Sequence, residues 1–334
     1  MKKRIFWIDV VKVIAICMVI YAHVFWIIRD AKIDGTFAME FFLKNSIVVS
    51  LGVPLFMMVS GTLLFDKSFT SKLDILAFYK RSLLPLVITA EIWIIAYSLV
   101  VQESFSLKEL LLCMIFIHKP EVHLWYVRMI VMYYLAVPFL NILRQRYKYV
   151  FISLLLAVLA FTFVYNGWLI WKGDLCPTTP SRSYLCYLVY MAIGYWISKM
   201  DISMSRCFIA VCGMLFGSYI LFSSLRATEY FLWYDNPLLA CIAISLFYII
   251  RAGFDSYTMS GKLQSWISEI SKMSYGIYLS HFILIYAVGM YFHLYGCSEM
   301  MLFVSLIAVF CVNVCAIFAI RMFFPRLAQL MLRY

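Results

Sequence analysis

Residues 300–320 read MMLFVSLIAVFCVNVCAIFAI, an unbroken apolar run without a charged side chain. A membrane-spanning α-helix needs about 20 such residues, whereas a surface helix of a soluble protein is apolar on one face only. Comparable runs recur along the whole chain. Because they are continuous, they do not fit the alternating segments of about 10 residues that build a transmembrane β-barrel. The chain is therefore predicted to be an all-α, polytopic integral membrane bundle.

The composition supports this prediction. Of the 334 residues, 65% are hydrophobic and 13% are charged, and the mean hydropathy is +0.92. Soluble domains carry roughly 45–50% apolar and about 25% charged residues, so a soluble globular protein and a disordered chain are both excluded. The ten cysteines show no metal-ligand or redox spacing, which argues against a disulfide framework.

The apolar runs predict about ten transmembrane helices. No connecting segment is long enough for a separate soluble domain, so residues 1–334 are expected to form a single membrane-embedded domain. The first run is interpreted as an uncleaved span, because Asp9 and Lys12 interrupt it and no small-residue cleavage site follows. The expected spans are 5–28, 46–65, 82–101, 123–143, 149–170, 184–199, 206–224, 236–251, 273–293 and 300–323.

Positive charge gathers on one side of these spans, for example in residues 2–4, 67–81 and 144–148. An excess of Lys and Arg marks the cytoplasmic side of a membrane protein. With an even number of spans, both termini are predicted to be cytoplasmic. The net charge of +11 is accordingly a topology signal and does not indicate nucleic-acid binding.

Three shorter segments are expected near the membrane surface. Residues 110–117 are apolar but too short to span the bilayer, so they lie in the interface or re-enter the membrane. Apolar residues between 263 and 270 recur at helical spacing and predict a flat surface helix. Residues 326–333 show a similar pattern.

Asp9, Lys12 and His23 fall on one stripe of the first span, because helical residues advance by about 100° each. Lys12 and His23 are about 16 Å apart along the axis, with Lys12 toward the cytoplasm. Such a stripe can hold an anionic group at its inner end and perform acid–base chemistry near its outer end. Asp9 and Lys12 also fit an ordinary interfacial ion pair. A histidine in the hydrocarbon region has little structural purpose, so a functional role is favoured for His23.

A second polar group lies at the outer start of the fourth span and comprises Glu121, His123, Trp125 and Arg128. His123 is expected near the depth of His23. Arg128 lies about a turn and a half deeper, where it could pair with Glu91 of the neighbouring span. Such a pair is either structural or part of a substrate-binding cavity, and the sequence leaves both alternatives open.

The third group is Ser274, Tyr278 and His281, which share one face of the ninth span. These side chains either line a polar cavity or bond to neighbouring helices. Ser60 and Gly61, near the inner end of the second span, form a small-residue pair of the kind that allows close helix packing.

In this order, the polar groups resemble the transmembrane acyltransferase-3 family, and the resemblance covers almost the whole chain. The basic residue of the first motif is usually arginine in the family and is Lys12 here. Lysine binds phosphate as a point charge but lacks the planar fork of arginine. The overall pattern is similar to O-acetyltransferases of envelope polysaccharides, of the enterobacterial common antigen type. The matching segments are IDVVKVIAICMVIYAH (8–23), VPLFMMVSGTLLF (53–65), HLWYVRMIVMYYLAVPFL (123–140) and KMSYGIYLSHFILI (272–285).

The resemblance implies an O-acyltransferase of the inner (cytoplasmic) membrane. Its donor would be a cytoplasmic acyl-CoA, expected to be acetyl-CoA, with succinyl left open. Its acceptor would be a hydroxyl group of an envelope glycan or a lipid-linked saccharide. The acyl group would cross the membrane inside the protein, and no metal is required.

The resemblance also implies roles for the polar residues. His23 would be the general base or would carry the acyl group itself, and His123 or Arg128 would stabilise the oxyanion. The expected catalytic residues are His23, Asp9 and His123; the donor-binding residues are Lys12, Ser60 and Ser274; the substrate-binding residues are Glu91, Trp125, Arg128, Tyr278 and His281.

Two other classes of function remain open from the sequence. A secondary transporter or flippase for a lipid-linked saccharide would use Glu91, Arg128 and the histidines as a proton path. The sequence shows no internal repeat and no interrupted spans, which speaks against it. A non-catalytic scaffold gives no reason for histidines inside three spans. The oligomeric state is not readable from the sequence.

Overall fold

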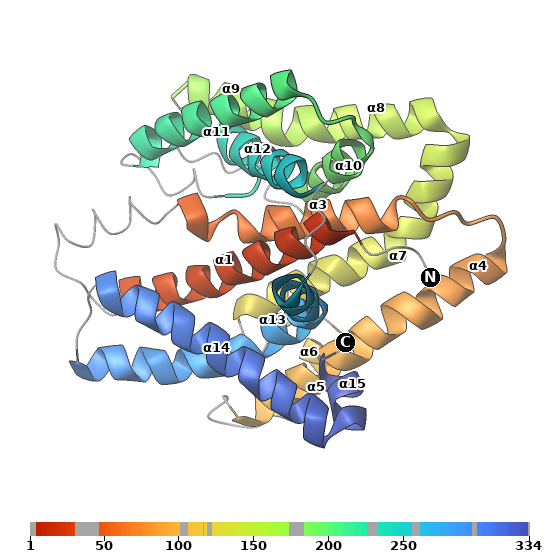
Figure 1. Cartoon of the computed structure of the whole chain (residues 1–334). Helices are drawn as coiled ribbons and strands as arrows, with labels where there is room; N and C mark the ends of the chain where they lie inside the picture. Colours follow the sequence, from red (N-terminus) through yellow and green to blue (C-terminus); the bar gives the residue numbers. More distant parts are fainter. Residues whose placement is uncertain are drawn as a thin grey trace.

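The computed structural model describes residues 5–30, 47–100, 106–115, 117–118, 122–173, 184–225, 233–255, 261–295 and 299–332. Within these ranges the regular structure is helical and no β-strand occurs (Figure 1). Nine helical segments of this part of the chain are long and apolar enough to cross a membrane. The predicted all-α membrane bundle is confirmed.

The first half of the chain contributes four of the nine candidate spans. One of them joins α4, the π-helical turn η1 and α5 without a break, and its start is fixed by a capping box between Ser71 and Asp74. The helices are α1 (Phe6–Asp30), α3 (Gly52–Leu64), α4 (Lys72–Phe78), η1 (Tyr79–Leu83), α5 (Leu84–Val100), α6 (Leu107–Met114), η2 (Val122–Leu124) and α7 (Trp125–Arg146).

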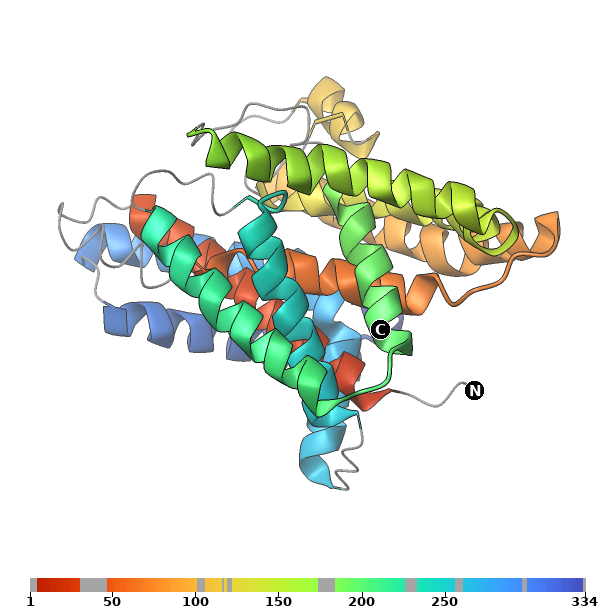
Figure 2. The same ribbon diagram turned by 90° about the horizontal axis from the view of Figure 1, so that it is seen from above.

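The second half contributes five candidate spans. Figure 2 shows α11 and α12 side by side, with the α8–α9 segment running across the neighbouring layer. The helices are α8 (Lys148–Leu159), η3 (Ala160–Val164), α9 (Tyr165–Trp171), α10 (Cys186–Lys199), α11 (Met204–Leu225), α12 (Pro237–Phe254), α13 (Lys262–Tyr295), α14 (Glu299–Phe323) and α15 (Pro325–Leu332).

The expected span 184–199 is shorter in the structure than a transmembrane helix. α10 has 14 residues, which is about 21 Å at the helical rise and less than the hydrocarbon thickness. α10 packs closely against α3, although Trp196 remains 44% exposed. A Cβ on Gly61 would lie 1.9 Å from the Met191 carbonyl oxygen, and a Cβ on Gly194 would lie 2.2 Å from the Met58 carbonyl oxygen. The two glycines let the backbones touch, which is the packing role expected for Gly61.

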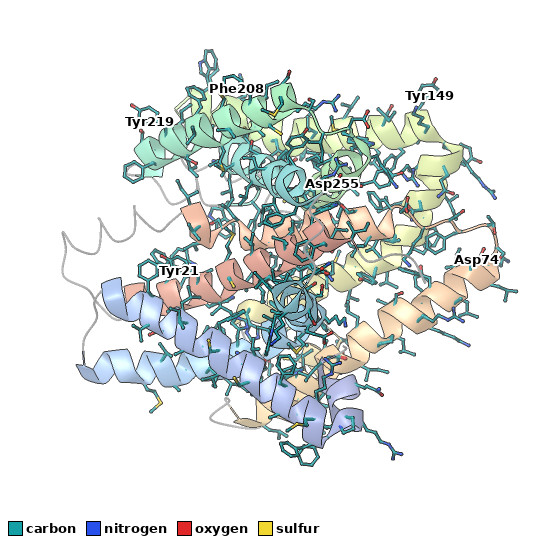
Figure 3. All side chains as sticks on the ribbon, viewed as in Figure 1. Tyr21, Asp74, Tyr149, Phe208, Tyr219 and Asp255 are labelled. Carbon is teal, nitrogen blue, oxygen red and sulfur yellow. The ribbon has the colours of Figure 1, made fainter. Side chains whose placement is uncertain are left out.

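α1 occupies the centre of the bundle, between α3 on one side and α13 and α14 on the other (Figure 1). Its apolar residues Ile16, Ile20 and Val24 are fully buried. Other helices face outward: Phe208 and Tyr219 of α11 project from the surface and are 70% and 72% exposed (Figure 3). Of the polar stripe of α1, Asp9 is buried and Lys12 and His23 are half-buried.

The three short segments have different outcomes. The segment 110–117 overlaps the eight-residue helix α6 (Leu107–Met114), which is too short to span. Residues 325–332 form the amphipathic helix α15, whose Ala328 and Leu332 are buried against the bundle. The predicted helix at 263–270 is present but is not a separate element. It is the first part of α13, which runs on for 34 residues because no proline or glycine interrupts it before Gly276.

Candidate active site

Three histidines from distant parts of the chain meet inside the bundle. His23 lies on α1, His123 in the short η2 turn before α7, and His281 on α13. The ring centroids are 5.1 Å apart for His23 and His281, 5.4 Å for His123 and His281, and 6.1 Å for His23 and His123. His123 and His281 are buried, and His23 is half-buried. The predicted proximity of His23 and His123 is present, and His281 joins them.

Aromatic rings and backbone hydrogen bonds fix the three imidazoles. Phe282 stacks on His123 at 4.6 Å and meets the edge of His23 at 5.2 Å. The Tyr278 hydroxyl donates to the backbone carbonyl of His123, and the Tyr97 hydroxyl donates to the carbonyl of Leu279 at 2.8 Å. Both bonds join α13 to the elements that carry or surround His123, so the cluster is held between helices.

The hydrogen bonds of His281 determine which of its nitrogens is available for chemistry. Nδ1 lies 2.6 Å from the Tyr278 carbonyl oxygen. A carbonyl only accepts, so Nδ1 carries the proton and the Nε2 lone pair is free in the neutral ring. Nε2 of His281 and both ring nitrogens of His123 are buried and have no hydrogen-bond partner. Such nitrogens are costly to bury and need an explanation, which polar atoms of a substrate would supply.

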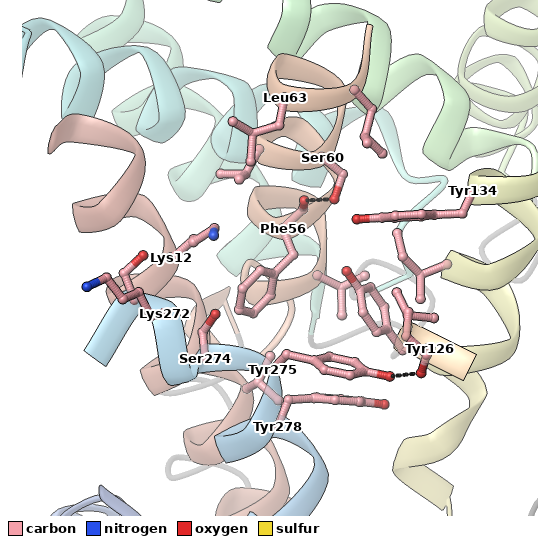
Figure 4. A pocket seen from close by; sticks show the side chains of 17 residues that line it. Lys12, Phe56, Ser60, Leu63, Tyr126, Tyr134, Lys272, Ser274, Tyr275 and Tyr278 are labelled. Atoms are coloured by element: carbon pink, nitrogen blue, oxygen red, sulfur yellow. Dashed lines mark hydrogen bonds between the residues drawn. The ribbon is translucent and has the colours of Figure 1, made fainter. Parts of the chain in front are cut away.

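A cavity of about 340 Å³ lies next to the cluster. Its walls are largely apolar and come from α1, α3, α5, α7 and α13. Figure 4 shows the polar side chains that interrupt these walls. The three residues predicted to bind the donor, Lys12, Ser60 and Ser274, all line this cavity.

Tyr278 connects the cavity to the histidines. Its ring lines the cavity and lies 5.3 Å from the ring of Tyr126, another lining residue. On its other side the same ring lies 5.8 Å from His123 and 6.0 Å from His281. The cavity and the histidine cluster therefore share one wall, the ring of Tyr278.

The chain was compared with known protein families. Residues 5–322 match the acyltransferase domain of the acyltransferase-3 family. The chain belongs to this family. No curated protein and no solved structure was found to match the chain. Membership makes the protein a multi-pass membrane acyltransferase, whose reaction needs an acyl donor and an acceptor.

Trp125 and Arg128 of the acyltransferase belong to an aromatic cluster beside the histidines. The Trp125 ring lies parallel to that of Tyr184 at 6.4 Å and within 6.1 Å of Tyr187 and 5.8 Å of Tyr234. The Arg128 guanidinium lies over Tyr184 and donates to its hydroxyl at 2.6 Å. Trp125, Arg128, Tyr184 and Tyr234 are partly buried, whereas Tyr187 is buried.

Asp9 is not part of the histidine cluster. Its carboxylate accepts hydrogen bonds from the hydroxyls of Ser271 at 2.7 Å and Ser268 at 3.0 Å, both on α13. It is 3% exposed and lies about 21 Å from His23 along the axis of α1. Its contacts join the inner ends of α1 and α13. The structure therefore places Asp9 where it positions helices, away from the imidazoles.

The predicted ion pair between Glu91 and Arg128 is wrong. Glu91 Oε2 is buried without a hydrogen-bond partner, whereas Arg128 donates to Tyr184 and, at 3.4 Å, to the Ile117 carbonyl. Burial raises the pKa of Cys113 on α6, and the carboxylates of Glu109 and Glu91 raise it further. Glu91 thus faces α6. Depth along a span predicted the pairing, but depth does not tell which neighbour a side chain faces.

Several residues of the site were not predicted from the sequence. Phe282, Tyr97 and Tyr126 were counted as ordinary aromatics of the spans. Lys272 was counted as a cytoplasmic charge, yet it lines the cavity. Its position three residues before Tyr275 and six before Tyr278, on one face of a continuous helix, was the available signal. Among the described residues, no group of three His, Cys, Asp or Glu side chains is placed to hold a metal ion.

Proposed function

We propose that this acyltransferase moves an acyl group, expected to be acetyl, from cytoplasmic acyl-CoA to a hydroxyl of an envelope glycan or lipid-linked saccharide. The observation that carries the proposal is the shared wall at Tyr278, a single ring that lines the Lys12 cavity and also contacts His123 and His281. The excess of Lys and Arg on one side supports a cytoplasmic position for both termini and for the Lys12 end of the cavity.

The cavity suits the pantetheine arm of the donor. Its volume of about 340 Å³ falls within the ~300–1,000 Å³ of ordinary ligand pockets. Apolar walls with scattered hydroxyls match a chain of methylene and amide groups. Lys12, at the inner end, would attract the phosphates as a point charge. The nucleotide itself would stay at the cytoplasmic surface, and the thioester would point toward His23.

In the first form of the reaction His23 is the general base. One imidazole nitrogen takes the proton of the acceptor hydroxyl, whose oxygen attacks the thioester carbonyl carbon. The carbon–sulfur bond then breaks, and the imidazolium returns the proton to the departing CoA thiolate. A partnerless nitrogen of His123, if protonated, would donate to the oxyanion. Atoms and charges balance without any further reactant.

In the second form His23 carries the acyl group. One imidazole nitrogen attacks the thioester carbonyl carbon and the carbon–sulfur bond breaks. The proton of the other ring nitrogen passes to the departing thiolate, so CoA leaves as the thiol and a neutral acyl-imidazole remains. The acceptor hydroxyl then attacks the acyl-imidazole and regenerates His23. His281 would take the hydroxyl proton in this form, because its Nε2 lone pair has no hydrogen-bond partner. Recovery of an acylated peptide containing His23 after a rapid quench would distinguish the two forms.

The aromatic cluster of Trp125, Tyr184, Tyr187 and Tyr234 would bind the acceptor. Flat rings offer apolar faces to the carbon–hydrogen faces of a sugar, and Arg128 adds a hydrogen-bond donor beside them. Trp125 follows His123 by two residues, so a sugar on this surface has its hydroxyls near the imidazoles. Donor and acceptor would thus approach the histidines from different sides.

A cellular experiment tests the proposal against the transporter alternative. Cells making wild type or His23→Ala protein are compared for glycan O-acylation and for export of the unmodified glycan. We expect the variant to lose O-acylation while export continues, because the glycan's own path does not depend on this chain. Loss of export together with acylation would contradict the proposal and favour a transporter. Variant His118→Ala, an exposed histidine paired with Glu109, is the matched control.

A further inference from the structure

A second cation lines the donor cavity. Lys12 lines it from α1 and Lys272 from α13. In Figure 4 the Lys12 ammonium points into the cavity, whereas that of Lys272 points away from it, and it bonds to Glu269. Ser271 and Ser274 of α13 supply hydroxyls on the same wall as Lys272. The remaining lining is mostly apolar. Two cations at one end of an apolar cavity make that end suited to an anionic group.

Lys272 is held by a neighbouring carboxylate. Its ammonium bonds to one oxygen of Glu269, three residues earlier on α13, and the other oxygen of Glu269 accepts from Arg321 of α14 at 2.6 Å. The side chains of Lys272 and Glu269 are 39% and 27% exposed, so the pair lies at the water-accessible end of the helix. Partly exposed pairs of this kind contribute little to stability and exchange partners readily.

We propose that Lys272 is a second phosphate-binding residue of the donor site and that Glu269 holds its place until the donor arrives. The inference rests on the proposed function, since it concerns the same cavity. Lys12 and Lys272 bracket the diphosphate from two helices. On binding, the ammonium of Lys272 exchanges the Glu269 carboxylate for a phosphate oxygen, and Glu269 keeps its bond to Arg321. No covalent step is involved.

A comparison of two donors that carry the same thioester distinguishes phosphate binding by Lys272 from a structural role. Acetyl-CoA carries the phosphates, whereas acetyl-pantetheine has the same arm and acyl group without them. The full-length protein in lipid nanodiscs is assayed with each donor. Lys272→Met keeps the apolar stem and removes the charge. The matched control is Lys262→Met, an exposed lysine at the start of the same helix that does not line the cavity.

We expect Lys272→Met to raise the KM for acetyl-CoA about tenfold, which corresponds to about 1.4 kcal/mol. The KM for acetyl-pantetheine should stay unchanged, and Lys262→Met should change neither value. Glu269→Gln removes the competing carboxylate, so it should lower the KM for acetyl-CoA. Such a gain would not arise from damage to the fold.

Three results would overturn the inference. One is an equal KM change with both donors, which would show a structural role for Lys272. Another is an unchanged KM for acetyl-CoA in Lys272→Met. The third is a higher KM for acetyl-CoA in Glu269→Gln. If the wild type cleaves neither donor, the proposed function itself fails, and that outcome differs from all three.

Discussion

The imidazole rings of His23 and His281 lie 5.1 Å apart, although one residue belongs to the first helix and the other to α13 near the end of the chain. The contact depends on α1 and α13 packing along each other. It also depends on the Asp9 carboxylate, which bonds to two serines of α13 at the inner end of the same pair of helices. The geometry of the histidine cluster and the helix packing at Asp9 are therefore linked through α1.

This link predicts that Asp9 acts through stability. Replacing Asp9 with Ala removes two hydrogen bonds to a buried charge and should lower the free energy of unfolding by about 2 kcal/mol or more. The double variant Ser268→Ala/Ser271→Ala should cause a similar loss. Thermal unfolding in detergent gives the stability, and activity per folded molecule gives the catalytic effect. If Asp9→Asn stays folded but loses kcat while the serine variant keeps it, Asp9 is catalytic after all.

The glycine contacts of α3 and α10 predict a steep steric effect. A methyl group on Gly61 would lie 1.9 Å from the Met191 carbonyl oxygen. This oxygen belongs to the backbone, so it cannot move aside by a side-chain rotation. Gly61→Ala should therefore prevent the two helices from packing. Gly253→Ala is the matched control, because nothing lies within 4 Å of its Cβ position, and it should stabilise α12 by about 0.5–1 kcal/mol. Monodisperse yield on size-exclusion chromatography measures both, and equal yields would refute the close contact.

The Tyr278 hydroxyl predicts a modest kinetic effect. Tyr278→Phe removes the bond to the His123 carbonyl and should lower kcat about fivefold, the equivalent of one neutral hydrogen bond of about 1 kcal/mol. Tyr79→Phe is the matched control. It removes a similar hydrogen bond, from the Tyr79 hydroxyl to the Leu135 carbonyl at 2.8 Å, and Tyr79 does not line the cavity. It should leave kcat unchanged. A wild-type kcat in Tyr278→Phe would show that this bond does not set the position of His123.

The orientation in the membrane can be tested with single cysteines in a background that lacks the ten native ones. Ser68 and Lys172 are both exposed and lie near opposite ends of candidate spans. Because Lys and Arg mark the cytoplasmic side, an impermeant maleimide should label Lys172→Cys in intact cells. It should label Ser68→Cys only after permeabilisation. The reverse pattern would contradict the predicted cytoplasmic side.

Sequence patterns were sufficient to predict where the long helices lie and which residues form each polar stripe. Nine of the ten expected spans are present as long apolar helices, because hydropathy over about 20 residues is a strong signal. α10 deviates because it is enclosed by protein, where a helix does not need to match the bilayer. Its two-glycine contact with α3 depends on a partner far away in the sequence, which hydropathy does not encode.

The arrangement of the site was only partly predictable. Helical spacing placed Ser274, Tyr278 and His281 on one face, and depth placed His123 beside His23. Neither could show that His281 contacts both, since a single sequence does not specify which helices are neighbours. Lys272 was missed for a different reason: the ninth span was expected to begin at residue 273, whereas α13 begins at Lys262. A lysine assigned to a loop was in fact on a cavity-lining helix.

The most direct test of the central claim is release of free CoA from acetyl-CoA by the purified protein in nanodiscs, with an extract of envelope glycans as acceptor. Wild type should release CoA and acylate the extract. His23→Ala should be at least about 100-fold slower, the lower range for loss of an acid–base group, and His118→Ala should match wild type. A folded wild-type sample that neither binds nor cleaves acetyl-CoA, or a His23→Ala variant that keeps the full rate, would contradict the account.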